Sequence, residues 1–453
     1  MSISSEIDRI IGAVSSAYTA INNKGGTLPA AANRTVGNLA DTIATIPAGG
    51  TEPYIEYTYD NNDNIVAAKM YGFTEIPKYC FNEISTMTSV DFSESPNIAK
   101  IGEYAFSNCS SLTLSSLPSG ITSIGEYAFS NCSNITLSSL PTGITSIGNH
   151  TFENCTNLAL TELPSGVTSI GEYAFASCES LALTSLPSGV TSIGTYAFSS
   201  CTSLALTSLP SGITSIEQYS FRGCISMALT SLPSGVTSIG TNAFEMATSL
   251  ALTELPSGVQ TIGGGAFRGC TNLALTSLPS GITSIVNFTF YQCTSLALTS
   301  LPSGVTSIGS NAFAFSSVAL TELPSNLETI DTGAFQRCRN LSITLIPSSV
   351  TKVGQEAFTY CTGLVNLEIA GKLSNAKCFT YCTNLQKVWL RDSCTTITAS
   401  TATSAPFCNC STSLEIYAEP SAKKSGWGSF YNRTGSSGGT TVTVTFNQTT
   451  KPW

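Results

Sequence analysis

The amino-acid sequence predicts a repeat solenoid, a β-rich stack of 23-residue coils whose short strands form parallel β ladders. The first observation is a repeated phrase: close variants of "SLALTSLPSGVTSIGTYAFSSC" recur along much of the chain. The second is the period, because ten phenylalanines at one repeat position, from Phe106 to Phe313, stand 23 residues apart. A fixed period of about 20–50 residues is typical of solenoids, in which each unit is too small to fold alone and is covered by its neighbours.

Each copy of the repeat contains the elements of one coil. Leu181–Leu186 is predicted to form a short extended apolar segment, which Pro187 ends. Val190–Ile193 is predicted to form a second one, whose stacked copies would pair in parallel. Ala197–Cys201 is predicted to close the coil on a helical turn.

Composition and charge exclude several classes of function. Only 10% of the 453 residues are charged, and the net charge is −9 without any basic stripe, which disfavours a nucleic-acid partner. No apolar run approaches the roughly 20 residues that span a bilayer, so no membrane insertion is expected. The start, "MSISSEIDRIIGAV", lacks the basic and apolar regions of a secretory signal. We therefore expect folding in a cytoplasm, where the 16 cysteines remain thiols.

The repeat resembles a known family. Blocks of the form "LPSGVTSIGxxAFxxC", such as Leu186–Cys201, resemble the BspA-type leucine-rich repeat over residues 75–430. The "LALTSLP" segment departs from that family, which more often shows "LTSITIP". The resemblance implies a leucine-rich-repeat solenoid, which many members use for adhesion or partner binding.

Residues 1–48 form a different block, for which a small N-terminal helical module is predicted. Apolar residues spaced alternately by four and three indicate a heptad stripe. Two interpretations are open: a helical hairpin packed on the solenoid end, or an oligomerising stalk, for instance of a trimer. The block "SSEIDRIIGAVSSAYTAINNKGGTLP" is also similar to N-terminal modules of bacteriophage and prophage tail-fibre or receptor-binding proteins, which implies attachment to a virion. The stripe residues proposed for oligomerisation are Ile3, Ile7, Ile10, Val14 and Ile21.

Three further domains follow the helical module. Residues 49–74 are predicted to form a β-hairpin cap, with strands at Tyr54–Tyr59 and Ile65–Tyr71 around an Asn/Asp turn. The solenoid is assigned to residues 75–410. Residues 411–453 are assigned to a C-terminal cap and a terminal strand, "TTVTVTF".

The cysteines and the histidine that could support catalysis or metal binding are interpreted as structural residues. Ten cysteines from Cys109 to Cys361 share one repeat position, which Ala247 and Ser316 also occupy, so this position requires a small buried side chain. The only nucleophilic side chains near the single histidine, His150, are at core positions of the repeat. His150 is therefore interpreted as a surface residue. Cys394, Cys408 and Cys410 lack the spacing of a metal site. We therefore predict no catalytic residue, no metal, no cofactor and no enzymatic activity.

The two residues after "IG" vary most between repeats, which indicates solvent exposure. Six of them are aromatic and would form a row along the solenoid. One interpretation is a binding row that stacks sugar rings or anchors a protein. The other is a packed surface in which only the tyrosine hydroxyls meet water. The row residues are Tyr104, Tyr127, Tyr173, Tyr196, Tyr219 and Phe288.

The sequence thus predicts a non-enzymatic binding protein. The first hypothesis is a phage or prophage tail-fibre-like adhesin that recognises a bacterial surface glycan or protein, with virion baseplate or tail proteins as further partners. It would be made in the bacterial cytoplasm and located in the virion tail. The alternative is a BspA-type surface adhesin or scaffold that binds host or neighbouring-cell proteins. That protein would be cytoplasmic or reach the cell surface by an unrecognised route.

Overall fold

The computed structural model describes residues 53–373, 377–391, 406–411, 413–419 and 443–446. The chain divides into two compact units, the first comprising Met1–Thr74 and Val90–Ile98 and the second Glu75–Ser89 and Ala99–Trp453. The predicted helical module, with its stripe residues Ile3, Ile7, Ile10, Val14 and Ile21, lies outside the described residues.

The first unit contains a small antiparallel hairpin. Strands β1 (Tyr54–Tyr59) and β2 (Ile65–Tyr71) pair as the sequence predicted. In the turn, Asp60 Oδ1 accepts hydrogen bonds from the backbone N–H groups of Asn62 and Asn64, at 2.8 and 2.9 Å. A third strand, β4 (Ser89–Glu94), lies beside β2. The domain limits drawn from the sequence remain predictions.

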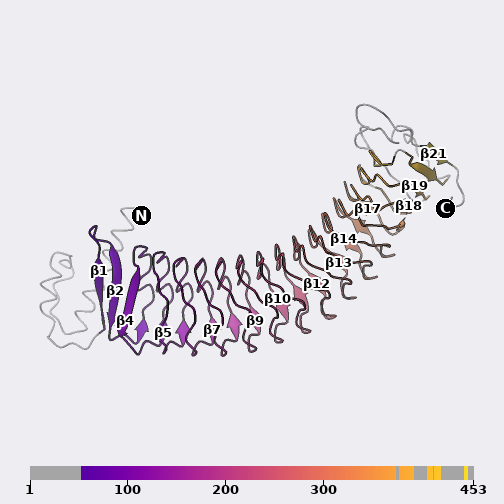
Figure 1. Ribbon diagram of the computed structural model, residues 1–453. Helices are drawn as coiled ribbons and strands as arrows, with labels where there is room; N and C mark the ends of the chain where they lie inside the picture. The colour runs from indigo at the N-terminus through magenta and orange to yellow at the C-terminus, as the bar shows by residue number, and fades with distance from the viewer. Residues whose placement is uncertain (1–52, 374–376, 392–405, 412, 420–442, 447–453) are drawn as a thin grey trace, which may run out of the picture. The chain divides into compact units, whose positions relative to one another are not determined.

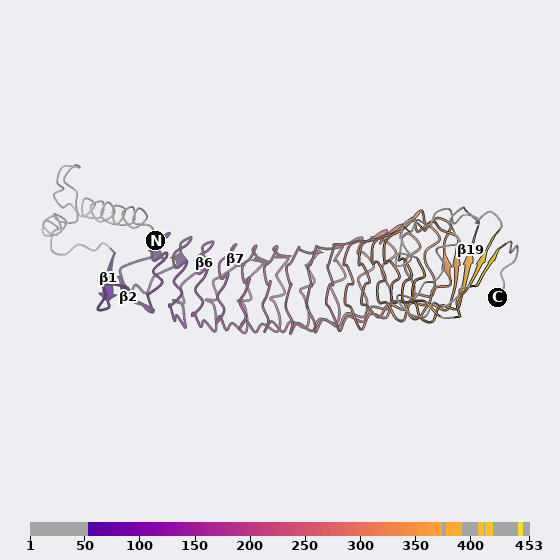
Figure 2. The same ribbon diagram turned by 90° about the horizontal axis from the view of Figure 1, so that it is seen from above.

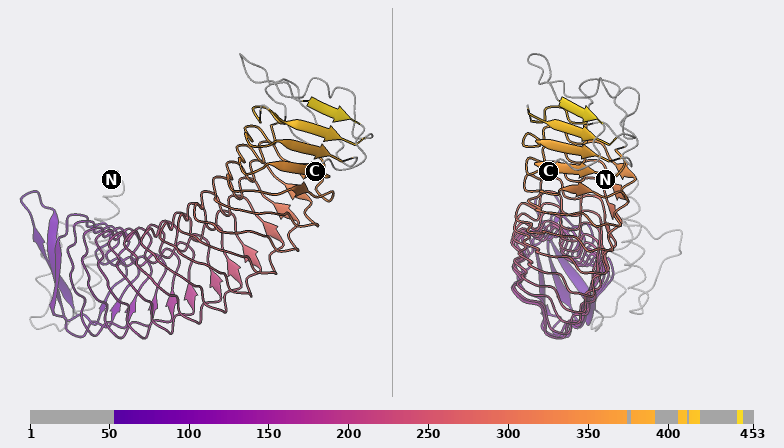
Figure 3. Two further views of the ribbon diagram at one scale, coloured as in Figure 1. Left: turned by 45° about the vertical axis from the view of Figure 1, so that its right-hand side comes forward. Right: turned by 90° about the vertical axis from the view of Figure 1, so that its right-hand side faces the viewer.

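The second unit confirms the predicted solenoid. Its coils follow one another in sequence order (Figures 1 and 2). Most coils contribute a two-residue strand at the "SI" position, and these strands pair in parallel and in register, as Ser215 with Ser238 and Ile216 with Ile239. They line up along one side of the coils (Figure 3). The strands are β3 (Glu75–Ile76), β5 (Lys100–Ile101), β6 (Ser123–Ile124), β7 (Ser146–Ile147), β8 (Ser169–Ile170), β9 (Ser192–Ile193), β10 (Ser215–Ile216), β11 (Ser238–Ile239), β12 (Thr261–Ile262), β13 (Ser284–Ile285), β14 (Ser307–Ile308), β15 (Thr329–Ile330) and β17 (Lys352–Val353).

The other extended segment of the coil forms strands only near the C-terminal end of the unit. In a regular coil, Ala205 N–H donates to Leu183 O at 3.0 Å, but Leu204–Leu209 is not a strand. In the last coils this segment forms five parallel strands. They are β16 (Leu345–Ile346), β18 (Asn366–Ile369), β19 (Lys387–Leu390), β20 (Glu415–Ala418) and β21 (Thr443–Phe446). The last of them, β21, confirms the predicted terminal strand.

The predicted helical turn at Ala197–Cys201 is wrong. Tyr196 and Ser200 both have positive φ, 56° and 62°, which no right-handed helix accepts. As a result, Ala197, Ser199 and Cys201 donate hydrogen bonds within their own coil, while Tyr196, Phe198 and Ser200 donate to the next coil. We name the segment from Tyr196 to Cys201, and its equivalents in the other coils, the outer turn. Its alternating backbone bonds form a second ladder between coils.

A column of phenylalanine rings runs through the core. Each ring is fully buried and stacks on the ring of the next coil; the centroids of Phe175 and Phe198 lie 5.4 Å apart, and those of Phe198 and Phe221 5.6 Å. The column begins at Phe81 and continues to Phe407. Each ring of the column therefore packs against rings of neighbouring coils, which fits units that cannot fold singly.

The strand ladder is interrupted at every third coil of the central region. The sheets β7–β8–β9, β10–β11–β12 and β13–β14–β15–β17 each begin at a coil with Thr or Ser before the core phenylalanine, where most coils have Ala. These residues are Thr151, Ser220 and Thr289, and all three are fully buried. The Thr hydroxyls donate to carbonyls of their own coil, Thr151 Oγ1 to Gly148 O at 3.0 Å and Thr289 Oγ1 to Val286 O at 2.8 Å. The strand ladder thus breaks at the coils that carry a buried Thr or Ser, and the central region consists of two three-coil blocks followed by one of four coils.

Candidate binding surface

Seven aromatic side chains of the outer turns stack into one continuous pile, which we name the tyrosine ladder. Adjacent ring centroids lie 4.3–5.0 Å apart, and the ring planes are within 23° of parallel. The side chains are partly exposed. Five of them belong to the predicted row, and two, Tyr79 and His150, were not assigned to it. The members are Tyr79, Tyr104, Tyr127, His150, Tyr173, Tyr196 and Tyr219.

Every member of the tyrosine ladder has a left-handed backbone. Tyr173, for example, has φ 52° and His150 has φ 54°. This conformation costs roughly 1–2 kcal/mol for a residue with a β-carbon. Further along the chain the same position holds Asn242 and Gly265, which are residue types that accept it readily. Ring stacking returns about 0.5–1.5 kcal/mol per pair, in addition to the apolar area that each ring buries. The backbone conformation therefore does not itself require an aromatic residue at this position.

The ladder presents ring edges and hydroxyl groups, because neighbouring rings cover the inner faces. Burial raises the pKa of the Tyr127 hydroxyl, and the nearby Tyr104 and the carboxylates of Glu153, Glu126 and Glu172 act in the same direction. The hydroxyl thus remains a protonated hydrogen-bond donor at physiological pH.

The coils of the ladder from Tyr104 to Tyr219 are acidic, whereas Tyr79 has Lys78 Nζ over its ring at 5.1 Å. Residues 101–221 contain seven glutamates and no lysine or arginine. His150 Nδ1 lies 2.9 Å from Glu153 Oε2, so the one histidine is paired with an acid beside the stack. The surface therefore suits a partner with basic or hydrogen-bond-accepting groups.

Phe288, the sixth residue of the predicted row, lies apart from the ladder. Asn242 and Gly265 occupy the two intervening positions, so the stack ends at Tyr219. Phe288 is 39% exposed and belongs to a second group on the later coils, which we name the arginine–aromatic cluster. Its members, joined by ring or cation–π contacts, are Arg268, Phe288, Tyr291, Phe315, Arg337, Tyr360 and Tyr381.

Sequence reasoning missed most of this cluster because it examined only the two variable residues after "IG" in each repeat. The two residues after the core phenylalanine vary as well, for example Gln336–Arg337 and Thr359–Tyr360. The second of these also has positive φ, 61° at Arg337 and 62° at Tyr360. Asn and Gly at the same position in earlier coils, such as Asn131 and Gly223, were the available signal.

The cysteine column lies inside the solenoid and is structural. Each thiol donates a hydrogen bond to the backbone carbonyl of the core phenylalanine in the preceding coil, as Cys201 Sγ does to Phe175 O at 3.0 Å. Cys382 and Cys410 extend the column beyond the ten predicted members. Burial raises the pKa of Cys109 and Cys338 to about 12, so these thiols stay protonated and unreactive at neutral pH.

We expect the column thiols to resist modification in the native protein. With a pKa of about 12, roughly one thiol in ten thousand is ionised at pH 8, and burial blocks access as well. Ellman's reagent at pH 8 should leave the column unreacted in native protein and titrate all 16 cysteines in guanidinium. Cys201→Ala, which copies Ala247, should lower only the denatured count, by one. Rapid reaction of most thiols in native protein would contradict a closed core.

The described residues contain no group of three His, Cys, Asp or Glu side chains placed to hold a metal ion. A surface recess of about 280 Å³ lies between two turns, and its single ionisable side chain is Glu162. Within the described part of the chain, no helix has the length and apolar character needed to cross a membrane. None of these features supplies catalytic groups.

The comparisons with known proteins fit this geometry. Residues 74–205, 191–319 and 306–437 match the BspA type leucine rich repeat region, in six copies. No curated protein matches the chain.

Several solved structures are similar to the chain. A leucine-rich repeat protein from Bacteroides ovatus is 22% identical, with 86% of this chain and 98% of that chain covered and a TM-score of 0.58. A leucine rich cell surface protein from Faecalibacterium prausnitzii is 24% identical, with 72% and 96% covered and a TM-score of 0.38. The T. pallidum leucine rich repeat protein is 26% identical, with 50% and 89% covered and a TM-score of 0.30. The first of these similarities supports the fold alone.

Proposed function

Because the chain belongs to the BspA-type leucine-rich-repeat family, we propose that it is a non-enzymatic binding protein of adhesin type whose contact surface is the tyrosine ladder. The observation that carries the proposal is the unbroken pile of aromatic rings at left-handed positions. The left-handed backbone itself belongs to the fold, since other outer-turn residues such as Asn131 and Ser200 share it, so the continuous run of aromatic residues is what distinguishes this surface. Tyrosine is also among the residue types that dominate binding energy at interfaces.

The geometry favours a protein partner over a glycan. Stacking of a sugar needs an open ring face, and within the ladder each face is covered, as that of Tyr196 is by Tyr173 and Tyr219. The exposed edges and hydroxyls instead suit backbone carbonyls and basic side chains. The repeated coil spacing offers the same contact many times, so weak individual contacts add up along the array.

The setting of this adhesin is a finer proposal. A phage or prophage tail fibre, attached to the virion through residues 1–48 and oligomerised through their heptad stripe, is supported by the sequence resemblance of that block. The alternative is a surface adhesin or scaffold of a bacterium, which binds host or neighbouring-cell proteins. Neighbouring tail and lysis genes would favour the first, and surface-export genes the second.

We expect the double variant Tyr127→Asn, Tyr173→Asn to lose binding while keeping its stability. Asparagine is the chain's own choice at this position in Asn242, so the backbone should not resist the change. The probe is a peptide selected from a random display library for binding to the whole chain. Its Kd, measured by calorimetry, should rise at least about tenfold in the variant, since two interface tyrosines are removed.

The matched control is Tyr59→Asn, an equally polar change at a tyrosine that is 55% exposed on the hairpin. It should leave the Kd unchanged. Peptides that bind the double variant as tightly as the native chain would contradict the ladder as the site. Ladder-dependent binding of glycans on an array, without any selected peptide, would contradict the protein partner.

A further inference from the structure

The arginine–aromatic cluster holds one arginine between two rings. The Arg337 guanidinium carbon lies 4.7 Å from the centroid of Tyr360 and 5.3 Å from that of Phe315, which come from the following and the preceding coil. Tyr360 in turn stacks on Tyr381, with centroids 4.4 Å apart and planes within 4°. The aromatic faces fix the plane of the guanidinium, while its edge, which carries the N–H donors, remains available.

Arg337 differs from most other arginines of the described chain in lacking a carboxylate. Arg222 and Arg268 both pair with Glu245, at 2.9 and 3.0 Å, and Arg391 has two acidic partners. Among the described residues, Arg337 and Arg339 form no ion pair, and both are exposed.

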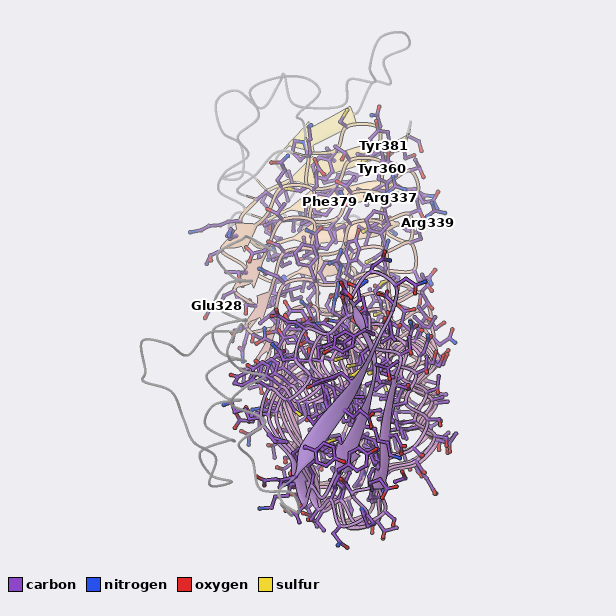
Figure 4. All side chains as sticks on the ribbon, turned by 90° about the vertical axis from the view of Figure 1, so that its left-hand side faces the viewer. Glu328, Arg337, Arg339, Tyr360, Phe379 and Tyr381 are labelled. Carbon is purple, nitrogen blue, oxygen red and sulfur yellow. The ribbon has the colours of Figure 1, made fainter. Side chains whose placement is uncertain are left out.

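The free arginines lie on one side of the coils together with the tyrosines of the cluster. Figure 4 shows Arg337, Arg339, Tyr360 and Tyr381 on the same side, with Glu328 on the opposite side and Phe379 inside. The surrounding segment is also basic in an acidic protein: residues 268–391 contain eight lysines and arginines against five acids, while the whole chain has a net charge of −9. A ligand attracted here is therefore recognised by this surface and not by the charge of the whole molecule.

We propose that Arg337, Tyr360 and Tyr381, with Arg339, form a second binding site, which takes a carboxylate-bearing segment of a protein. A planar guanidinium with an open edge matches a carboxylate with two parallel hydrogen bonds. Prior ordering by the two rings reduces the conformational entropy lost on binding. The faces of Tyr360 are occupied by Arg337 and Tyr381, which favours a peptide that meets ring edges over a sugar that needs a face. The site is separate from the tyrosine ladder and does not depend on its role.

The test is binding of a fluorescein-labelled oligoglutamate peptide to the full chain, followed by fluorescence anisotropy. Arg337→Gln should raise the Kd at least about tenfold, as expected for loss of a bidentate charge-assisted pair. Gln292 holds the same outer-turn position with φ 60°, so the substitution suits the backbone. Arg337→Lys should bind the peptide almost as weakly as Arg337→Gln does, because lysine keeps the charge but lacks the planar guanidinium. Arg339→Gln provides a second variant that lies outside the ring stack.

The control is Lys352→Gln, which removes one positive charge from an exposed side chain already paired with Asp331 at 2.5 Å. It should change the Kd by less than about twofold. Equal losses in Arg337→Gln and Lys352→Gln, or no binding of oligoglutamate at all, would overturn the proposal. So would tighter binding of oligogalacturonate, which would assign the surface to an acidic glycan. Melting temperatures of all variants, measured in parallel, separate lost binding from lost folding.

Discussion

Phe198→Ala should lower the free energy of unfolding by about 3–5 kcal/mol, the usual cost of removing a fully buried phenylalanine. The ring stacks on Phe175 and Phe221, so the cavity would lie between three coils and neither neighbour could fill it alone. Urea denaturation followed by circular dichroism measures the change. Hydrogen exchange should show faster opening in the coils on both sides, because stability in such arrays depends on nearest neighbours.

Phe288→Ala is the matched control, since it removes the same side chain from an outer turn where 39% of it is exposed. We expect a loss below about 1 kcal/mol there. Similar losses of unfolding free energy in the two variants would show that the phenylalanine column does not stabilise the core.

Gly194→Ala should also destabilise the solenoid, by about 1–3 kcal/mol, through overpacking. A β-carbon at Gly194 would lie 2.6 Å from the backbone nitrogen of Glu172 in the preceding coil, and Gly194 N–H also donates to Ile170 O at 2.9 Å. Glu217 and Val286 occupy the same position in coils where the strand ladder breaks, whereas Asp331 occupies it where β15 pairs with β14 and β17. The fold therefore persists with a side chain at this position in some coils. Denaturation midpoints in urea measure the effect.

Gly189→Ala is the control in the same coil. A β-carbon there would meet Val167 O at 3.7 Å, an ordinary contact. The change should be neutral or stabilising by about 0.4–1 kcal/mol, because alanine restricts the unfolded chain. Equal midpoints for the two glycine variants would contradict the close approach of backbones at Gly194.

The core of the fold could be predicted from the sequence because its causes are local and repeated. The spacing of phenylalanines fixes the coil length, and the Val190–Ile193 segment contains the strand Ser192–Ile193. The outer turn was mispredicted as helical because the sign of φ cannot be read from a tyrosine. It could be read from Asn242 and Gly265, which occupy the same position as Tyr196 in later coils.

A row of aromatic residues at one variable position could be predicted from the sequence, but the geometry of the row could not. Variation beside a fixed core located Tyr127 and Tyr173 on the surface. Whether adjacent rings would stack depends on the distance between coils and on the left-handed backbone, and neither is written in a single repeat. The same limits explain why Phe288 was grouped with the tyrosines, although two residues without rings, Asn242 and Gly265, separate it from them.

The division of the strand ladder into blocks has a consequence for how a gene of this kind can change. Each of the three central blocks begins at a coil with a buried Thr or Ser, so a whole block inserted or deleted by recombination between repeats would meet neighbours shaped like those it left. Such an event would alter the separation between the tyrosine ladder and the arginine–aromatic cluster in whole steps. The distance between the two surfaces could therefore vary among related proteins without any substitution in the core.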